Sequence, residues 1–309
     1  MNTPSMLQQW SRERAQLAAA LTPHAVALAL ARHRSLSGIH WRGPFIVTAA
    51  EALAGSDEVA VISEHGTRRA SVVACDLATD VAVLRTEADD NADRSLTKLA
   101  APASGAELEA GGGVIIVGRA PRGALIGFGS VRVAGPAWRS RRGGSIARRL
   151  EFEAVLDDRF EGALVADLTG LAAAMLVPGP RGSLLGIPAA TVERIVLAVE
   201  QHGYLPRPFL GLRLQALWLD EATRGRWGRK ARSVAAVAGI ESGSPAEAAG
   251  LAPGDLLEAI DGVALDDVEA FAAEVSESSP GRVLELRLRR GGQPQTLQIT
   301  VAQWRRPAH

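Results

Sequence analysis

The chain contains 309 residues, with 34 basic and 34 acidic side chains that give a formal net charge of zero. A chain of this length can bury the cores of two domains, and its balanced charge excludes a strong overall attraction to nucleic acids or anionic membranes. Its one cysteine, Cys75, excludes an internal disulfide, and a small buried apolar role is expected for it.

The N-terminal segment predicts a helix rather than a signal peptide. Apolar residues recur at helical spacing over residues 4–21, and Pro23 ends the pattern. Charged residues at positions 12–14 precede the apolar stretch, which Pro23 then interrupts, so the segment differs from an export signal. No apolar window reaches the length of a transmembrane helix. We therefore expect a cytoplasmic protein without a membrane span, with the periplasm as the alternative.

Short apolar stretches bounded by turn residues follow and predict a mainly β region. The first group of expected strands is Ala25–Ala31, Pro44–Ala49, Val59–Ser63, Arg68–Cys75 and Val81–Arg85. The second group is Val114–Val117, Gly129–Val133, Leu150–Leu156, Gly162–Ala166 and Leu171–Val177. A helix over Ala189–Gln201 is expected to close this region and to end at Gly203, since glycine accepts a left-handed C-cap.

The last third of the chain predicts a mixture of helices and strands. Ser244, Pro245 and Glu247 have the order of a helix start, in which Ser caps, Pro takes the first position and Glu completes a capping box. Gly250 suits the left-handed end of that helix, and Asp261-Gly262 predicts a hairpin turn. The further expected elements are a helix over Asp267–Glu277 and strands over Leu256–Ile260, Val283–Arg289 and Thr296–Val301.

Three segments have the order and spacing of a protease motif set. Val47–Leu53 contains Glu51, Asp76–Leu84 contains Asp80, and Asp158–Gly170 contains Glu161. These segments resemble the Thr-x-x-His, Asp and Ser segments of the HtrA/Deg family, which are chymotrypsin-like serine proteases followed by PDZ domains. The resemblance implies an N-terminal helix over residues 1–24, a chymotrypsin-like double β-barrel over 25–203 and an α+β PDZ domain over 204–309.

The resemblance also implies that two of the three triad positions have changed. Glu51 stands at the His position and Glu161 at the Ser position, while Asp80 matches the family's Asp. A serine triad needs a hydroxyl nucleophile and a neutral base, and loss of one member typically lowers turnover by on the order of 10⁴–10⁶. Arg159 replaces a Gly of the oxyanion loop, where positive φ favours Gly. These changes predict a pseudoprotease; the alternative is a working serine endopeptidase of protein quality control with a non-standard site.

Three carboxylates would meet in one cleft if the protease fold is kept. Because Glu51, Asp80 and Glu161 cannot all ionise without a free-energy penalty, at least one should have a raised pKa or a cationic partner. Arg159 and Arg42 are the candidates for that partner. A hard cation such as calcium is one alternative, since it prefers oxygen ligands, and carboxylates that point to solvent are the simpler one. We expect neither a metal nor a cofactor.

The C-terminal third carries the more specific resemblance. Gly243–Leu251 resembles the central motif of bacterial PDZ domains, and Phe209–Leu212 resembles their carboxylate-binding loop. By this resemblance, the site for a peptide C-terminus is made by the backbone of Leu210, Gly211 and Leu212 and by the side chains of Leu214, Val268 and Phe271. The alternative is a PDZ domain that only docks onto its own protease domain.

Arginines cluster near Trp138 and again near Trp227, a pattern that invites a nucleic-acid interpretation. No recognition motif accompanies them, so solvated loops or a protein-binding surface are expected instead. The expected function is a non-catalytic scaffold or regulator whose partners are protein C-termini, unfolded segments or an active protease paralogue. The N-terminal helix is expected to pack on the barrels; the alternative, which the resemblance implies, is a contact within a homo-oligomer.

Overall fold

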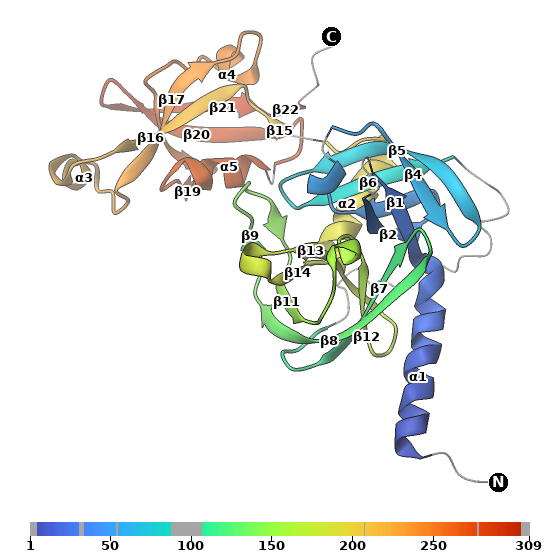
Figure 1. Ribbon diagram of the computed structural model, residues 1–309. Coiled ribbons are helices and arrows are strands. Elements are labelled where there is room, and N and C mark those ends of the chain that lie inside the picture. Colours follow the sequence, from blue (N-terminus) through green and yellow to red (C-terminus); the bar gives the residue numbers. More distant parts are fainter. Residues whose placement is uncertain are drawn as a thin grey trace. The chain divides into compact units, whose positions relative to one another are not determined.

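The chain forms two compact units, Met1–Leu205 and Pro206–His309, and each has its own hydrophobic core. The computed structural model describes residues 5–30, 34–53, 55–87, 107–206, 208–276 and 278–303, and Figure 1 shows its helices and strands. The mainly β architecture agrees with the expected fold class. Within these ranges no helix is long and apolar enough to cross a membrane.

The first six strands of unit 1 close into a barrel in the order β1-β2-β3-β6-β5-β4. Fully buried side chains such as Leu28, Ile46 and Leu84 form its core. The sequence does not predict β2, because serines and a glycine interrupt its apolar pattern. The bounds are β1 Ala25–Ala29, β2 Ser35–Arg42, β3 Phe45–Thr48, β4 Glu58–Ser63, β5 Gly66–Asp76 and β6 Val81–Thr86.

A second six-stranded barrel follows, with the order β11-β14-β13-β12-β7-β8. Between β8 and β11 the chain makes a small hairpin of β9 (Trp138–Arg139) and β10 (Ser145–Ile146), which reaches back to the first barrel. The bounds of the barrel strands are β7 Gly113–Ala120, β8 Gly123–Gly135, β11 Arg149–Glu153, β12 Leu164–Asp167, β13 Ala172–Pro178 and β14 Leu184–Pro188.

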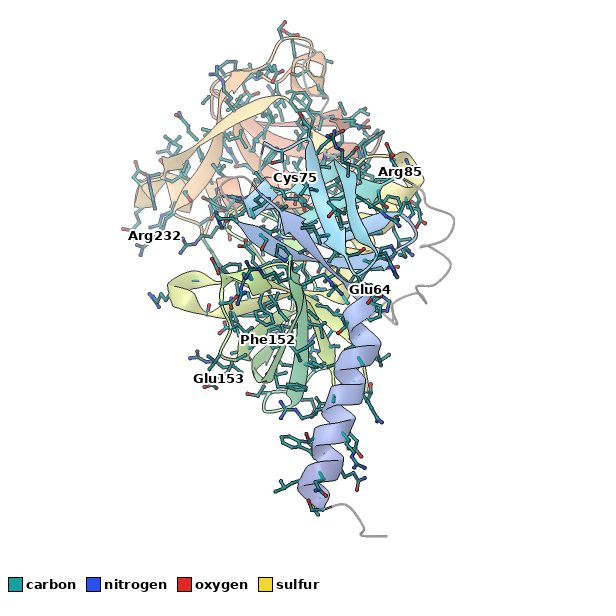
Figure 2. All side chains as sticks on the ribbon, turned by 45° about the vertical axis from the view of Figure 1, so that its right-hand side comes forward. Glu64, Cys75, Arg85, Phe152, Glu153 and Arg232 are labelled. Atoms are coloured by element: carbon teal, nitrogen blue, oxygen red, sulfur yellow. The ribbon has the colours of Figure 1, made fainter. Side chains whose placement is uncertain are left out.

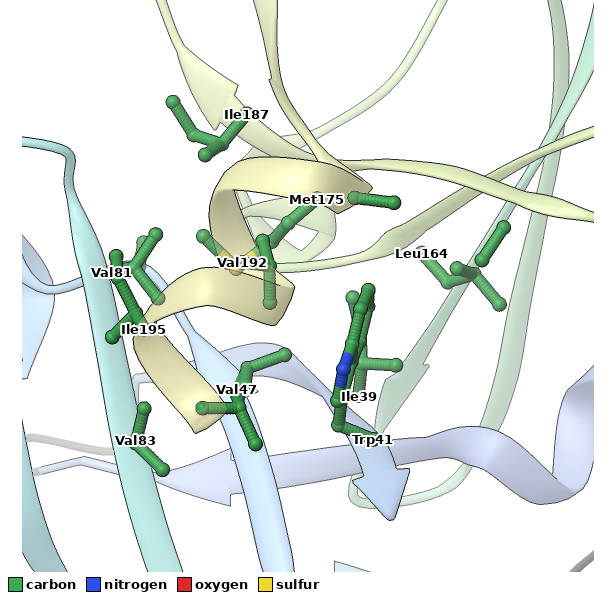
Figure 3. Packing of buried hydrophobic residues seen from close by; sticks show 14 of the residues in the cluster. Ile39, Trp41, Val47, Val81, Val83, Leu164, Met175, Ile187, Val192 and Ile195 are labelled. Carbon is green, nitrogen blue, oxygen red and sulfur yellow. The ribbon is translucent and has the colours of Figure 1, made fainter. Parts of the chain in front are cut away.

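Helix α2 (Ala189–His202) joins the two barrels, as Figure 3 shows. Val192 of this helix belongs to the same buried cluster as Val83 of the first barrel and Met175 of the second. The indole N–H of Trp41, on β2, donates to the carboxylate of Glu193 on α2 at 2.7 Å. Apolar burial and this hydrogen bond together hold the barrels and the helix in one unit.

Helix α1 (Met6–Leu21) is capped at Ser5, whose side chain accepts from the N–H of Gln8 while the Gln8 side chain accepts from the N–H of Ser5. Its C-terminal end is the most deeply packed part, because Leu21 is buried in the core between the barrels. Further up the helix the guanidinium of Arg14 stacks on the ring of Phe128, 3.5 Å from its centroid. The first turns project side chains without a packing partner in Figure 2, and Met6 is 86% exposed.

Unit 2 is built on the sheet β16-β17-β18-β20-β21, with α5 packed against its core. A short pair, β15 with β22, adjoins it, and β19 pairs with β18. The strands are β15 Pro208–Phe209, β16 Leu212–Trp218, β17 Ser233–Ile240, β18 Leu256–Ile260, β19 Val263–Ala264, β20 Val283–Arg290, β21 Gln293–Thr300 and β22 Ala302–Gln303. The helices are α3 Glu221–Trp227, α4 Pro245–Ala248 and α5 Val268–Ser276.

The expected start of α4 is confirmed with one difference. Ser244 caps the helix and accepts from the N–H of Glu247 at 3.3 Å, and Pro245 takes the first helical position. The carboxylate of Glu247 accepts from the N–H of Gly243 rather than from that of Ser244, so the box closes one residue earlier. Gly250 has a φ of 77°, which gives the helix its expected left-handed end.

An ion pair with a buried carboxylate fixes the turn between α4 and β18. Asp255, with a side chain only 1% exposed, makes two parallel contacts with the guanidinium of Arg290, at 2.7 and 2.8 Å. The same carboxylate accepts from the N–H of Ala252 at 2.8 Å. Burial by itself would raise the pKa of Asp255, but these bonds outweigh it and hold the pKa below the ordinary value.

Candidate functional site

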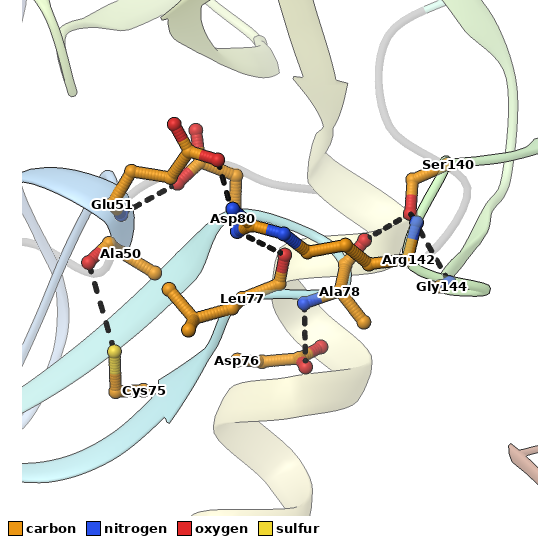
Figure 4. A network of polar contacts seen from close by, with 10 residues as sticks. All are labelled: Ala50, Glu51, Cys75, Asp76, Leu77, Ala78, Asp80, Ser140, Arg142 and Gly144. Atoms are coloured by element: carbon orange, nitrogen blue, oxygen red, sulfur yellow. Dashed lines mark hydrogen bonds and ion pairs between the residues drawn. The ribbon is translucent and has the colours of Figure 1, made fainter. Parts of the chain in front are cut away.

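The ends of two strands bring Glu51 and Asp80 together. After β3 the chain turns through Ala49 and Ala50 into a single helical turn, Glu51–Leu53, while Asp80 closes the β5–β6 connection in a left-handed conformation with a φ of 59°. The N–H of Glu51 donates to the Asp80 carboxylate at 2.9 Å, and the N–H of Ala50 donates to the Asp80 carbonyl at 3.3 Å (Figure 4). The Asp80 carboxylate therefore binds a backbone amide.

The side chain of Glu51 pairs with Arg142, which comes from the turn of the β9–β10 hairpin. Its carboxylate lies 2.9 Å from the Arg142 guanidinium, and the same guanidinium donates to the carbonyl of Leu77 at 3.3 Å. Ser140, in the same turn, donates to the carbonyl of Ala78. Figure 4 shows this hairpin reaching the segment that carries Asp80. Arg142 is thus the cationic partner of Glu51.

The expected cationic partners were wrong, although the charge argument behind them is confirmed. Arg42 pairs with Glu193 on α2 at 3.1 Å, and Arg159 pairs with its neighbour Asp157. Arg142 takes the role instead, but it lies far along the chain from Glu51, and only the β9–β10 hairpin brings it close. The sequence grouped this residue with an arginine cluster whose other members also contact the fold, such as Arg149 over the Trp138 ring.

Glu161 lies on the second barrel's side of the same cleft. It follows a short helical turn, Asp158–Phe160, and its carbonyl accepts from the N–H of Ser37 at 2.9 Å. Burial raises the pKa of Glu161, the negative charge of Asp80 raises it further, and the charge of Arg34 partly offsets both. The pKa of Asp80 is raised as well, mainly by burial. We call the region around Glu51, Asp80 and Glu161 the relic cleft.

Ser37 on β2 holds the loop that carries Glu161. Its hydroxyl donates to the carbonyl of Arg159 at 2.7 Å and accepts from the N–H of Arg119 on β7 at 3.0 Å. Gly162 packs directly against this serine: its φ is 81°, and an added Cβ would stand 2.2 Å from the Ser37 carbonyl oxygen. This close approach explains why a glycine follows the nucleophile position.

The backbone donors that would stabilise an oxyanion are already bonded within the loop. In trypsin-like sites these donors are the N–H of the nucleophile residue and that of the residue two positions before it. Here the N–H of Arg159 donates to the Asp157 carboxylate at 3.0 Å, and the N–H of Glu161 donates to the Asp158 carbonyl at 3.2 Å. The side-chain bond from Arg159 lowers the pKa of Asp157, so a negative charge lies where an oxyanion would need donors.

Sequence reasoning missed Asp157, although a local signal was present. Aspartate accepts readily from the backbone N–H two residues later, and Asp157 and Arg159 have this spacing with an added ion pair.

The geometry of the described residues does not support the hypothesis of a calcium site. In the part of the chain that the structure describes, no group of three or more His, Cys, Asp and Glu side chains is arranged to hold a metal ion.

In unit 2 the strand β16 lies beside the helix α5, where the sequence predicts a peptide groove. In the described ranges β16 pairs with one strand only, β17, and its other edge has no partner strand. Leu210 and Phe271 are buried, and the half-buried Leu212, Leu214 and Val268 pack against the same core. The six residues expected from the sequence are thus placed at one end of β16 and on the facing helix.

The loop before β16 approaches the start of α4 closely. Gly211 has a φ of 74°, and an added Cβ would stand 2.2 Å from the Cβ of Ser244. The carbonyl of Leu210 accepts from the N–H of Ala246 at 3.0 Å, and that of Gly211 accepts from the N–H of Glu241 at 2.9 Å. The carbonyls of the loop are therefore turned into the domain, which is the arrangement expected of a loop that presents N–H groups to a ligand carboxylate.

Comparisons with known proteins agree with both units. A family model for the PDZ domain matches residues 231–290. A probable periplasmic serine endoprotease DegP-like of Rhizobium meliloti (strain 1021) is 26% identical over 269 residues, covering 83% of this chain and 51% of that protein. A serine protease Do-like HtrA of Lactobacillus helveticus is 27% identical over 273 residues, covering 83% of this chain and 65% of the relative. The chain spans about half to two thirds of the length of these relatives.

Solved structures extend the likeness over nearly the whole chain. An HtrA-type protease AlgW with decapeptide has a TM-score of 0.71 at 20% identity, covering 95% of this chain and 99% of that one. A serine endoprotease from Yersinia pestis has a TM-score of 0.69 at 19% identity, covering 98% and 100%. At these identities the comparison shows the fold alone.

The relatives also correct the expected compartment. Those from Rhizobium, Brucella and Halomonas are named periplasmic endoproteases, so the expectation of a cytoplasmic protein was wrong. That expectation rested on residues that form the amphipathic helix α1, and the pattern of a folded helix carries no information about the compartment. With both barrels and the C-terminal sheet in place, the chain has the fold of an HtrA/DegP-like serine protease, a chymotrypsin-like double β-barrel, together with a PDZ domain.

Proposed function

We propose that this protein is a catalytically inactive HtrA-like protein of the periplasm that binds extended peptides and protein C-termini through its PDZ groove. The observation that carries the loss of catalysis is the bonded oxyanion loop around Asp157, Arg159 and Glu161. It adds to the exchange of two triad residues, because even a restored nucleophile would lack donors for its tetrahedral intermediate. The compartment follows the names of the periplasmic relatives.

The chemistry of the relic cleft supports this proposal. Glu51 is ion-paired with Arg142, so its carboxylate is not free to take the proton of a hydroxyl. Attack of the Glu161 carboxylate on a peptide would give an acid anhydride whose formation no oxyanion donor assists. A carboxylate with a raised pKa is also less nucleophilic at low pH, because more of it is protonated.

Peptide binding is supported by the open edge of β16 beside an apolar groove. A peptide can add to this edge as a further strand, with backbone hydrogen bonds supplying affinity and the groove residues choosing side chains. The likeness to an HtrA-type protease solved with a decapeptide points in the same direction. We propose an apolar C-terminal residue for the ligand, since Leu210, Leu212, Val268 and Phe271 belong to one apolar cluster beside the start of β16.

Casein cleavage tests the catalytic half of the proposal. The wild type should be inactive, and Glu51→His with Glu161→Ser should remain inactive because the oxyanion donors stay bonded. Adding Asp157→Ala and Arg159→Gly should release those donors and give measurable cleavage. Thermal unfolding of each variant checks that the fold is kept. Wild-type cleavage that survives both purification and Glu161→Ala would overturn the proposal.

A working serine endopeptidase is the second candidate function, favoured by the names of the relatives. A serine-directed fluorophosphonate distinguishes the two, since it labels an activated serine covalently. The proposal expects no labelling of the wild-type chain. Labelling at a defined serine, lost when that serine is replaced by alanine, would support the endopeptidase instead.

Peptide binding is tested with the full chain by fluorescence polarisation against C-terminal peptides with a free or an amidated terminus. The proposal expects binding only with the free carboxylate. Val268→Glu, in the groove, should weaken binding at least tenfold, whereas Val283→Glu on β20, at a side chain 52% exposed, should leave it unchanged. Equal binding of free and amidated peptides would contradict the proposed carboxylate site.

A further inference from the structure

Apolar side chains line the proposed peptide groove only along the first half of β16. Leu212 and Leu214 pack against the core that contains Phe271 of α5. From Gln215 onward every residue of the strand is exposed, although its pairing with β17 continues to its last residue, Trp218, opposite Ser233. A peptide that adds to this edge therefore has several residues of backbone to pair with beyond the groove.

Trp218 lies on the same face of β16 as the groove residues. Side chains alternate along a strand, so Leu212, Leu214 and Trp218 share one face. The register shift in this pair adds one residue to β17, because Arg213 pairs with Gly239 and Leu214 with Val237. The alternation along β16 is therefore uninterrupted, and the indole continues the apolar row that begins in the groove. It is 75% exposed.

Hydrogen bonds fix the backbone around Trp218 close to the N-terminal end of α5. The next residue, Leu219, donates its N–H to the carbonyl of Arg232 at 2.9 Å. Ser233, the strand partner of Trp218, donates its hydroxyl to the carbonyl of Asp266 at 3.1 Å, two residues before α5. The indole is thus presented by a tethered strand end beside the groove rather than by a loose loop.

We infer that Trp218 forms a second peptide subsite, which takes an apolar side chain about six residues before the ligand's C-terminus. This inference rests on the proposed peptide binding at Leu210–Leu212. An antiparallel strand pairs residue for residue, so if the last ligand residue lies opposite Leu212, the residue opposite Trp218 is about six positions upstream. Directly opposed side chains share a face, which places that residue over the indole.

The connection between β16 and β17 carries more cations than anions, because the exposed Arg226, Lys230 and Arg232 outnumber Asp220 and Glu221. These cations attract acidic ligands in general. The indole is the feature of this end that can favour an apolar side chain. An aromatic or large aliphatic side chain gains most there, because a tryptophan offers a large flat apolar surface.

A library of nine-residue C-terminal peptides, selected on the full chain, tests this inference. We expect apolar residues to be enriched at the last position and again at the sixth position before it. Selection at the last position without enrichment upstream would overturn the subsite and leave the proposed function standing. No selection at either position would overturn both.

Variants then assign the upstream preference to one side chain. Trp218→Ala should remove the upstream enrichment and weaken the selected peptide about fivefold by fluorescence polarisation, the loss expected for one aromatic contact. A shortened peptide with only its last five residues should bind the wild type and Trp218→Ala equally. Leu217→Ala is the matched control, because Leu217 is exposed on the opposite face. If it weakens binding as much as Trp218→Ala does, the face assignment fails.

Discussion

The relic cleft of unit 1 and the groove of unit 2 differ in what their backbone groups do. In the cleft, the N–H groups of Arg159 and Glu161 and the carboxylate of Asp80 are all bonded within the chain. In the groove, one edge of β16 has no partner strand in the described ranges. A site can act on a ligand only with hydrogen-bonding groups that the fold has left available. The comparison therefore supports the proposal that ligands bind to unit 2.

The largest effect should come from the buried carboxylate of Asp255 in unit 2. Asp255→Ala removes the acceptor of the Ala252 N–H and of the half-exposed Arg290 guanidinium. It should lower the free energy of unfolding of this unit by about 3 kcal/mol, because several hydrogen bonds to a charged group are lost together. Peptide binding should fall with it, while the transition of unit 1 stays in place. Differential scanning calorimetry measures both transitions. The control is Glu58→Ala, which removes the exposed pair with Arg69 and should change stability by less than about 0.5 kcal/mol.

In unit 1, a comparable loss of stability should follow from a substitution at Gly162. Gly162→Ala adds left-handed strain of about 1–2 kcal/mol, and its Cβ would stand 2.2 Å from the Ser37 carbonyl oxygen, so the summed loss should reach about 3 kcal/mol. Gly43→Ala separates the two contributions, because Gly43 has a φ of 46° with open space around it. It should lose only the strain. Equal losses in urea titrations would show that Gly162 is not under steric pressure.

Glu161 of unit 1 and Asp255 of unit 2 should also contribute to the pH dependence of stability with opposite signs. Burial and Asp80 raise the folded-state pKa of Glu161, so its stabilising contribution is fully present below about 4.3, the unfolded value, and is lost as pH rises through the folded pKa. The lowered pKa of Asp255 means that its contribution is present above about 3.9 and is lost as pH falls through the folded pKa.

Glu161→Gln tests this difference in sign. The variant should be more stable than the wild type at pH 7, and this difference in stability should vanish toward pH 4. Thermal melts of unit 1 at several pH values measure the difference. The exposed Glu87→Gln serves as the control for the loss of a surface carboxylate. A gap that widens on acidification would mean that Glu161 is stabilised as a carboxylate, contrary to its burial.

The smallest effect should come from the ion pair between Glu51 and Arg142. Their side chains are 60% and 53% exposed, so Glu51→Gln should cost less than about 1 kcal/mol. Added salt should weaken the pair in the wild type and leave the variant unchanged. A loss well above this value would show that the β9–β10 hairpin depends on this one contact.

Local patterns in the sequence were sufficient for much of the fold. The cap at Ser244, the left-handed Gly250 and the Asp261-Gly262 turn, where φ is 46° and 80°, each follow from the residues themselves. Strand β2 could not be predicted, because its glycine is set by contacts from elsewhere. A Cβ on Gly38 would lie 3.1 Å from Val26 and 3.2 Å from Ile46.

The candidate site was predictable in position but not in its contacts. Spacing along the chain located Glu51, Asp80 and Glu161, since each follows a recognisable strand pattern. The partner of Glu51 could not be read in this way, because Arg142 reaches it through a hairpin whose geometry depends on both barrels. The sequence did contain a local signal for Asp157, because an aspartate readily accepts from the N–H two residues later, which here belongs to Arg159. Trp218 acquires its role only once the register of β16 is known.

Ser37 has a consequence for how unit 1 folds. Through this residue, β2 of the first barrel bonds to β7 of the second and to the carbonyls of Arg159 and Glu161. A polar residue buried at this junction can be satisfied only when both barrels are assembled, and leaving it unsatisfied costs about 1–3 kcal/mol. The two barrels therefore form one cooperative folding unit, in which neither is expected to persist once the other has opened.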